Sequence, residues 1–220
     1  PSPDFVLESP QRDPSRQLAH IVESYQAVLE YSRPDVTVVV GDVTSTLACS
    51  IAARYNAVPV VHAEAGLRSR DPSMLEEINR VMVDSVSDLL WATTDVAKQN
   101  LLDEGTPADR IVVIGNLMID SMVAIRSASP EILKTPQHID LTEPYAIVTL
   151  HRPNNVDDAN RLEQIMVALK ELSRQVTIVW PVHPRLKNSV REFKRWNTDA
   201  GLRILPAMAY SEFQSLLEGS

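Results

Sequence analysis

Residues 58–80 read VPVVHAEAGLRSRDPSMLEEINR. The apolar segment 58–61 is typical of a parallel strand that helices cover on both faces, because such a strand must be almost wholly apolar. Polar residues return at His62, which therefore marks the carboxyl end of the strand. Ligands of open α/β sheets bind at that edge. The stretch thus predicts a buried strand with a candidate site directly after it.

The residues that follow this strand are spaced for a ligand site. His62 and Glu64 lie two apart in an extended segment, so both side chains are expected to point into the same cleft. Gly66 permits a turn, and residues 76–87 then show helical spacing that begins with two glutamates. A helix dipole favours negative charge in its first turn. A purely structural interpretation stays open, in which Glu76 and Glu77 are ordinary acids at the start of a helix and Glu64 is a solvated loop residue.

Strands and helices alternate along the chain on both sides of this stretch. Apolar runs predict strands at residues 5–7, 36–40, 58–61, 89–92, 111–114, 145–150, 176–182 and 202–205. Helical spacing predicts helices at residues 15–31, 44–55, 76–87, 94–104, 117–126, 160–174, 185–198 and 211–217. The order predicts an α/β fold with parallel sheets and right-handed crossovers. The β-branched run 36–40 is expected to be a central, buried strand.

The composition changes near the middle of the chain. Residues 128–144 are polar, carry three prolines and show weak periodicity, which is typical of a domain boundary. We therefore expect an N-terminal Rossmann-like domain at residues 1–127, a linker region at 128–144 and a C-terminal Rossmann-like domain at 145–220. The two domains would face each other across a cleft.

Composition excludes several function classes. The 220 residues have a net charge of -8 and no block of Lys or Arg, which argues against a nucleic-acid or anionic-membrane surface. The single cysteine, Cys49, lies in a predicted buried helix and cannot form a disulfide within the chain. The sequence has neither an apolar run of transmembrane length nor a signal-peptide pattern, so we expect a cytoplasmic protein.

Ionisable residues recur at the ends of four predicted strands. Asp42 follows one strand, His62 and Glu64 another, His151 and Arg152 a third, and His183 a fourth. A lone histidine at a strand end is more often structural. The whole set favours a ligand cleft, because side chains from separate elements can converge only at that edge.

Other motifs point away from several chemistries. The six glycines are scattered, so neither a nicotinamide fingerprint nor a phosphate-binding loop is present. The histidines lack metal-ligand spacing, and no Gly-x-Ser-x-Gly motif occurs. We expect no cofactor and no metal.

Five spaced motifs resemble one enzyme family. They are GD at 41–42, HAEAGLR at 62–68, EEINR at 76–80, GNLMID at 115–120 and TLHRPNNVD at 149–157. Together and in this order they resemble the non-hydrolysing UDP-N-acetylglucosamine 2-epimerases. The resemblance implies two Rossmann-like domains in a glycosyltransferase-B-like arrangement. It also implies interconversion of UDP-GlcNAc and UDP-ManNAc for cell-surface polysaccharides.

The resemblance also implies roles for individual residues. Asp42, Glu64 and Glu76 match the family's catalytic carboxylates, with Glu77 left open as an alternative to Glu76, and His151 matches its active-site histidine. The remaining matches are expected to bind substrate: His62, Arg68, Arg80, Arg152 and His183. The implied reaction eliminates UDP to give a 2-acetamidoglucal and adds it back, and the implied assembly is a homodimer. A hydrolysing 2-epimerase that releases ManNAc, a glycosyltransferase of the same fold and a non-catalytic nucleotide-sugar sensor remain alternatives.

The ends of the chain suggest a fragment of a longer protein. The first residue is Pro1, a predicted strand follows almost at once, and the last helix ends directly before Ser220. The family's amino-terminal Gly-Thr-Arg-Pro-Glu segment and carboxyl-terminal Ser-Gly-Gly loop are absent. We expect both domains to be incomplete and the fragment alone to be inactive.

Overall fold

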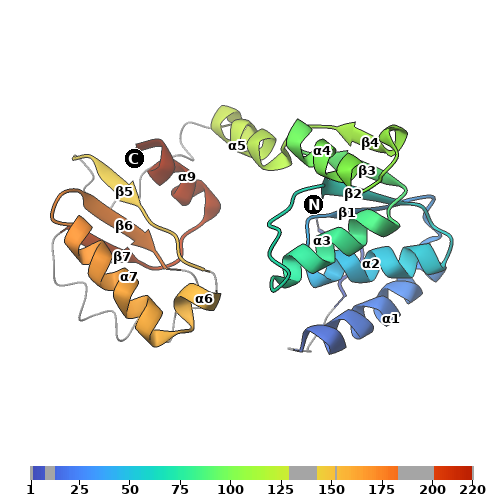
Figure 1. Ribbon diagram of the computed structural model, residues 1–220, viewed down its shortest axis with the longest axis horizontal. Helices are drawn as coiled ribbons and strands as arrows, with labels where there is room; N and C mark the ends of the chain where they lie inside the picture. Colours follow the sequence, from blue (N-terminus) through green and yellow to red (C-terminus); the bar gives the residue numbers. More distant parts are fainter. Residues whose placement is uncertain (1, 8–12, 129–142, 152, 183–200, 220) are drawn as a thin grey trace. The chain divides into compact units, whose positions relative to one another are not determined.

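The computed structural model describes residues 2–7, 13–128, 143–151, 153–182 and 201–219 (Figure 1). The chain forms two compact units, Pro1–Ile119 and Asp120–Ser220. Each contains a parallel sheet with helices between its strands, which confirms the predicted fold class. The division falls inside helix α5 (Leu117–Ala128) rather than after it. Most of the predicted linker lies outside the described residues.

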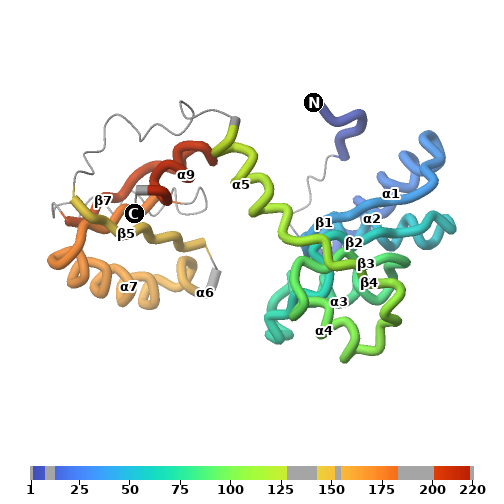
Figure 2. The backbone as a smooth tube through the Cα atoms, turned by 90° about the horizontal axis from the view of Figure 1, so that it is seen from above, coloured from blue at the N-terminus to red at the C-terminus, as the bar shows by residue number. Residues whose placement is uncertain are grey.

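The first unit contains a four-stranded parallel sheet. Its strands are β1 (Thr37–Val40), β2 (Val60–Ala65), β3 (Leu89–Ala92) and β4 (Ile111–Val113), and they follow one another in chain order across the sheet (Figure 2). The connecting helices are α1 (Pro14–Ser32), α2 (Thr44–Tyr55), α3 (Leu75–Val86) and α4 (Asp95–Asp103), with a short 3₁₀ turn, η1, at Ala108–Arg110. All four carboxyl ends therefore meet at one edge.

Apolar side chains hold the helices of this unit against the sheet. Val39 and Val60 pack with Leu47 of α2 and Val83 of α3 in one buried cluster. A second cluster joins β3 and β4 to α4 through Leu90, Ala92, Leu101 and Ile111. Helix α1 lies against α2 (Figure 1), and its Tyr25 hydroxyl also forms a hydrogen bond of 3.2 Å with the Thr37 hydroxyl of β1. These clusters hold α2, α3 and α4 against the sheet.

Strand β1 differs from its predicted place in the sheet. Among the described residues it pairs only with β2, so it is an edge strand and not a central one. Val38 and Val40 are 51% and 52% exposed, whereas Val39 is buried. The β-branched run thus identified a strand correctly, but the run could not show that one of its faces lacks cover.

A further sequence prediction, at the start of the chain, is wrong. Residues 5–7 do not form a strand, and Phe5 instead lies edge-on to Tyr31 of α1, with ring centroids 5.7 Å apart. Helix α2 begins at Thr44 as predicted, and its N-cap residue, Val43, forms no side-chain cap hydrogen bond. The nearby Thr46 hydroxyl donates to the carbonyl oxygen of Val40 at 2.8 Å and so ties α2 to the end of β1.

The second unit contains a three-stranded parallel sheet in the order β5-β6-β7. Its strands are β5 (Tyr145–Ile147), β6 (Thr177–Pro181) and β7 (Leu202–Leu205), and its helices are α6 (Pro153–Val156), α7 (Ala159–Leu172) and α9 (Tyr210–Gly219). Trp180, Ile178 and Leu202 form its core with Met166 of α7. The predicted helix 185–198 lies outside the described residues. Within the described ranges, no helix is long and apolar enough to cross a membrane.

Candidate active site

Two strand-end turns of the first unit lie directly side by side. Gly41 directly follows β1 and has a φ of +73°, and its amide donates to the carbonyl oxygen of Ala63 in β2 at 3.1 Å. A Cβ at Gly41 would lie 3.5 Å from Oε2 of Glu64. Asp42, the next residue, therefore projects from a turn that already touches the Glu64 carboxylate.

Glu64 has an unusual backbone conformation. Its φ is +67°, in the left-handed region that non-glycine residues rarely occupy, and the pairing of β2 with β3 shifts register between Ala63 and Ala65. Such a bulge re-aims a side chain that strict alternation would place elsewhere. The prediction that His62 and Glu64 face one cleft is wrong for this reason, because His62 stays on the buried face while Glu64 is half-buried.

Arg80 of α3 lies between the two carboxylates. Its Nη1 is 2.6 Å from Oδ2 of Asp42, and its Nη2 is 3.9 Å from Oε2 of Glu64. The neighbouring Asn79 donates from Nδ2 to the carbonyl oxygen of Asp42 at 2.8 Å. The Nε atom of Arg80 is buried and has no hydrogen-bond partner among the described residues. Arg80, predicted to bind substrate, thus holds two carboxylates close together.

A pocket of about 270 Å³ opens beside this cluster. Asp42, Glu76 and Asn79 line it together with residues of α1 and α2. Glu76 is exposed in the first turn of α3. The first unit therefore gathers three carboxylates: Asp42 and Glu64 around Arg80, and Glu76 in the pocket that Asp42 also lines.

Glu77 has a different environment from Glu76. It is 8% exposed and accepts hydrogen bonds from the amides of Ser69 and Arg70, at 2.8 and 3.0 Å, and from the Ser69 hydroxyl. Burial by itself raises the pKa of Glu77, but these hydrogen bonds and the nearby Arg68 charge outweigh it, so the pKa is lowered. Glu77 therefore anchors the 69–70 loop, and Glu76 is the glutamate that faces the pocket.

His62 and Arg68 lie beneath the site. His62 is fully buried, with Nδ1 2.6 Å from Oδ1 of Asp84 and Nε2 2.8 Å from the carbonyl oxygen of Gly41. The Arg68 side chain is 2% exposed and pairs with Asp84 at 2.8 Å and with Glu104 at 2.5 Å. Burial opposes the Arg68 charge, but the bonds to Glu104 and Asp84 outweigh it and raise the Arg68 pKa. The structure does not support the prediction that His62 and Arg68 contact substrate, because the polar atoms of both side chains are already bonded to protein groups.

The sequence interpretation missed Asp84 and Glu104. The apolar residues Ile78, Val81 and Met82 of α3 are each more than 40% exposed. The residues that α3 buries include Asn79 and Asp84. A histidine directly after an apolar run was the available signal, since a ring that is buried within a strand needs polar partners.

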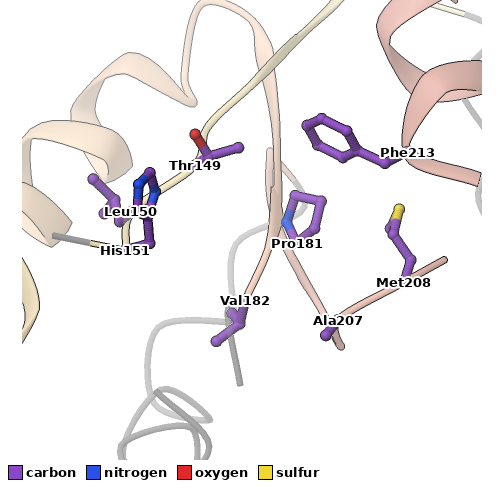
Figure 3. Close-up of a pocket in the computed structure, with 8 residues that line it drawn as sticks. All are labelled: Thr149, Leu150, His151, Pro181, Val182, Ala207, Met208 and Phe213. Carbon is purple, nitrogen blue, oxygen red and sulfur yellow. The ribbon is translucent and has the colours of Figure 1, made fainter. Parts of the chain in front are cut away.

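The second unit has its own pocket, of about 360 Å³, at the carboxyl ends of its strands. The lining residues are Thr149, Leu150, His151, Pro181, Val182, Ala207, Met208 and Phe213. Figure 3 shows His151 and Thr149 on one side of this pocket and Phe213 with Met208 on the other. His151 is exposed after β5, and most of the lining is apolar. Arg152 and His183, both predicted to bind substrate, lie outside the described residues.

These features define a class of protein. Two Rossmann-like units, each with a parallel sheet and a pocket at the carboxyl ends of its strands, are the elements of a glycosyltransferase-B-like α/β protein. The sequence model of the UDP-N-acetylglucosamine 2-epimerase family matches residues 1–220. The chain belongs to that family, which confirms the resemblance drawn from its motifs.

Curated relatives agree with this assignment. The UDP-N-acetylglucosamine 2-epimerase of Methanocaldococcus jannaschii is 33% identical over 224 residues, which cover 98% of this chain and 61% of the relative. The UDP-2,3-diacetamido-2,3-dideoxy-D-glucuronate 2-epimerase of Pseudomonas aeruginosa is 35% identical over 225 residues, covering 100% of this chain and 61% of the relative. The chain therefore spans about three fifths of the length of these relatives.

Solved structures show the same fold. The Methanocaldococcus jannaschii UDP-GlcNAc 2-epimerase in complex with UDP-GlcNAc and UDP has a TM-score of 0.86 and 32% identity, covering 100% of this chain and 62% of that one. The Neisseria meningitidis UDP-GlcNAc 2-epimerase bound to UDP-GlcNAc has a TM-score of 0.86 and 27% identity, covering 97% of this chain and 60% of that one.

Proposed function

We propose that the protein is a non-hydrolysing UDP-N-acetylglucosamine 2-epimerase, an isomerase that interconverts UDP-GlcNAc and UDP-ManNAc without a cofactor. The observation that carries this proposal is the carboxylate cluster of the first unit. Asp42 and Glu64 lie around Arg80, and Glu76 lines the pocket that Asp42 also lines. Membership of the 2-epimerase family supports the proposal.

The chemistry explains why several carboxyl groups are needed. The C2 proton of the sugar is not acidic, because no carbonyl group adjoins that carbon. In the proposed reaction a carboxylate removes this proton while the bond from C1 to the UDP oxygen breaks, which gives 2-acetamidoglucal and UDP. UDP then adds back to C1, and a carboxylic acid returns a proton to the opposite face of C2. Asp42, Glu64 and Glu76 are the proposed acids and bases.

The second unit is proposed to hold the nucleotide. Its pocket combines an apolar lining, suited to a base, with His151 at its edge, suited to donate to a diphosphate. Donors at the leaving group stabilise the charge that develops as UDP departs. Arg152 and His183 are proposed as further diphosphate ligands on the sequence motifs alone. A homodimer is likewise proposed from the resemblance.

Solvent exchange at C2 tests this proposal. The full-length protein would be incubated with UDP-GlcNAc in heavy water, and the products separated by chromatography and weighed by mass spectrometry. We expect UDP-ManNAc to form and both epimers to gain one deuterium. Free ManNAc with UDP would show a hydrolysing enzyme instead. Binding of UDP-GlcNAc with neither exchange nor product would show a nucleotide-sugar sensor.

One relative raises a second candidate substrate. The Pseudomonas aeruginosa protein that is 35% identical to this chain is a 2-epimerase of UDP-2,3-diacetamido-2,3-dideoxy-D-glucuronate. The chemistry at C2 is the same for both sugars, but this one carries a carboxylate at C6 and an acetamido group at C3. The exchange experiment would therefore be run with each sugar in parallel, and the larger kcat/KM identifies the substrate.

A further inference from the structure

Asp84 connects the two segments that carry Asp42 and Glu64, which are the turn after β1 and the end of β2. It is 5% exposed on α3 and has contacts with three groups. Its Oδ1 lies 2.6 Å from Nδ1 of His62, and its Oδ2 accepts from the amide of Gly66 at 3.1 Å and pairs with Arg68 at 2.8 Å. One buried carboxylate thus contacts β2 on both sides of Glu64.

The His62 ring extends this connection to the neighbouring strand. Nε2 of His62 donates to the carbonyl oxygen of Gly41, directly before Asp42, at 2.8 Å. The Gly41 carbonyl oxygen and the Asp84 carboxylate are both acceptors, so each ring nitrogen of His62 faces an acceptor at hydrogen-bond distance. The Asp84 carboxylate faces the other ring nitrogen and fixes the orientation of the ring. The position of the Gly41–Asp42 turn therefore depends on Asp84 through His62.

Glu64 is the residue that most needs such support. A non-glycine residue at positive φ is strained and persists only where its surroundings hold it. The φ of Glu64 is +67°, and the residues two before and two after it, His62 and Gly66, both bond to Asp84. The strained residue is thus fixed from both sides by the same side chain.

We propose that Asp84 is a positioning residue for the Asp42 and Glu64 carboxylates. It does not touch substrate, because it lies buried beneath the turns, but it sets the distance between the two turns that present these carboxylates. This inference rests on the proposed epimerase function. A displacement of about 1 Å at reacting groups can lower a rate on the order of a hundredfold, so loss of this support lowers kcat while leaving nucleotide binding in place.

The variant Asp84→Asn tests the proposal in the full-length protein. The amide has the same shape but cannot accept from His62, Gly66 and Arg68 together. We expect kcat to fall by about ten- to a hundredfold, with KM and UDP affinity within about threefold of wild type. The matched control is Glu104→Gln. It weakens the ion pair between Arg68 and the partly exposed residue 104, but it leaves the bonds of Asp84 to His62 and Gly66 unchanged. Its kcat should stay within about threefold of wild type.

Two outcomes would overturn the inference. One is an Asp84→Asn protein with kcat within threefold of wild type, and the other is an equal loss in Asp84→Asn and Glu104→Gln. If Asp84→Asn does not fold, His62→Asn replaces it, because the shorter amide can reach Asp84 but not Gly41. A normal kcat in a folded His62→Asn protein would then reject the proposal.

Hydrogen exchange separates this inference from the proposed function. In Asp84→Asn the amide of Gly66 should exchange faster than in wild type, and in Glu104→Gln it should not. If the wild-type protein shows no exchange at C2 of the sugar, the epimerase function fails. Even in that case, faster exchange of the Gly66 amide in Asp84→Asn, but not in Glu104→Gln, would show that Asp84 holds the turn. Unchanged exchange of this amide in Asp84→Asn would reject that role.

Discussion

Nη1 of Arg80 lies 2.6 Å from Oδ2 of Asp42, and the same guanidinium also faces the Glu64 carboxylate. Two carboxylates at neighbouring strand ends repel each other, and a cation between them makes the arrangement stable. The cluster keeps one net negative charge, since two carboxylates surround one guanidinium. This charge suits proton abstraction better than anion binding, so the diphosphate of the proposed substrate needs its donors elsewhere.

Glu64→Gln should keep nucleotide binding and lose turnover. The amide is the same size as the carboxylate but cannot take a proton at the pH of the reaction, and loss of a general acid or base costs roughly a hundredfold or more. Steady-state kinetics with UDP-GlcNAc measures kcat, and calorimetry measures UDP affinity. Glu30→Gln is the control, because Glu30 is an exposed carboxylate on α1. Wild-type turnover in Glu64→Gln would remove Glu64 from the mechanism.

Glu76→Gln and Glu77→Gln should behave differently although the residues are adjacent. Glu76 is exposed at the pocket, so its replacement should lower kcat by roughly a hundredfold and leave the melting temperature unchanged. Glu77 anchors residues 69 and 70 from a buried position, so its replacement should reduce the free energy of unfolding. Hydrogen bonds to a charged group are worth about 1.5–3 kcal/mol each. The reverse pattern would make Glu77 the catalytic residue.

The contribution of Glu77 should depend on pH. Its pKa is lowered in the folded chain, so the unfolded chain binds its proton more readily and acid favours unfolding. The stabilisation is complete above the unfolded pKa, about 4.3, and disappears as the pH falls through the folded pKa. Urea unfolding of wild type and Glu77→Gln from pH 7 to pH 3 measures this. The difference between the two proteins should shrink below about pH 4, and a difference that grows in acid would contradict the prediction.

His151→Ala should weaken UDP binding more than it disturbs folding. His151 is exposed at the pocket of the second unit and has little packing to lose. The loss of one hydrogen bond to a charged diphosphate, about 1.5–3 kcal/mol, corresponds to roughly a ten- to hundredfold weaker affinity. Calorimetry with UDP and a thermal melt measure the two effects. An unchanged affinity with a large fall in melting temperature would make His151 a structural residue.

Most element positions could be predicted because they depend on local patterns. Residues 44–55, 89–92 and 202–205 were predicted with the bounds that the structure shows, since an apolar run or helical spacing ends there at a turn residue. Local patterns fix these features without knowledge of what packs on them. The end of the second strand was placed wrongly at His62, because β2 runs from Val60 to Ala65 and His62 is fully buried within it.

The directions of side chains could not be predicted in the same way. Helix α3 turns Asn79 and Asp84 inward, because the backbone at Asp42 and Gly66 and the ring of His62 need polar partners. The spacing of apolar residues in the helix does not predict which of its polar side chains point inward. Similarly, nothing in the sequence marks Glu64 as a residue with positive φ. The alternation of side-chain directions in an extended strand was therefore applied from His62 to Glu64, where the register shift between Ala63 and Ala65 interrupts it.

Gly66→Ala should be far more destabilising than Gly105→Ala. Both glycines have positive φ, at +78° and +88°, so each substitution costs about 1–2 kcal/mol of backbone strain. A Cβ at Gly66 would also lie 2.3 Å from the carbonyl oxygen of Ala97, whereas a Cβ at Gly105 would meet nothing within 4 Å. Chemical denaturation of both variants isolates the steric part. Equal losses of stability would show that strain alone explains the glycine at position 66.

The exposed edge of β1 should make these 220 residues self-associate when they are produced alone. Among the described residues β1 pairs with β2 only, and Val38 and Val40 are about half exposed. An open apolar edge offers unpaired backbone groups to another chain, and a charge on such a strand blocks the pairing. Val38→Lys should therefore lower the apparent mass seen by light scattering at high concentration. Val96→Lys is the matched control, since Val96 is 72% exposed on α4 and away from the sheet edge. If both substitutions reduce association equally, added charge and not the β1 edge is the cause, and a wild-type chain that stays monomeric would show that the edge is not a site of pairing.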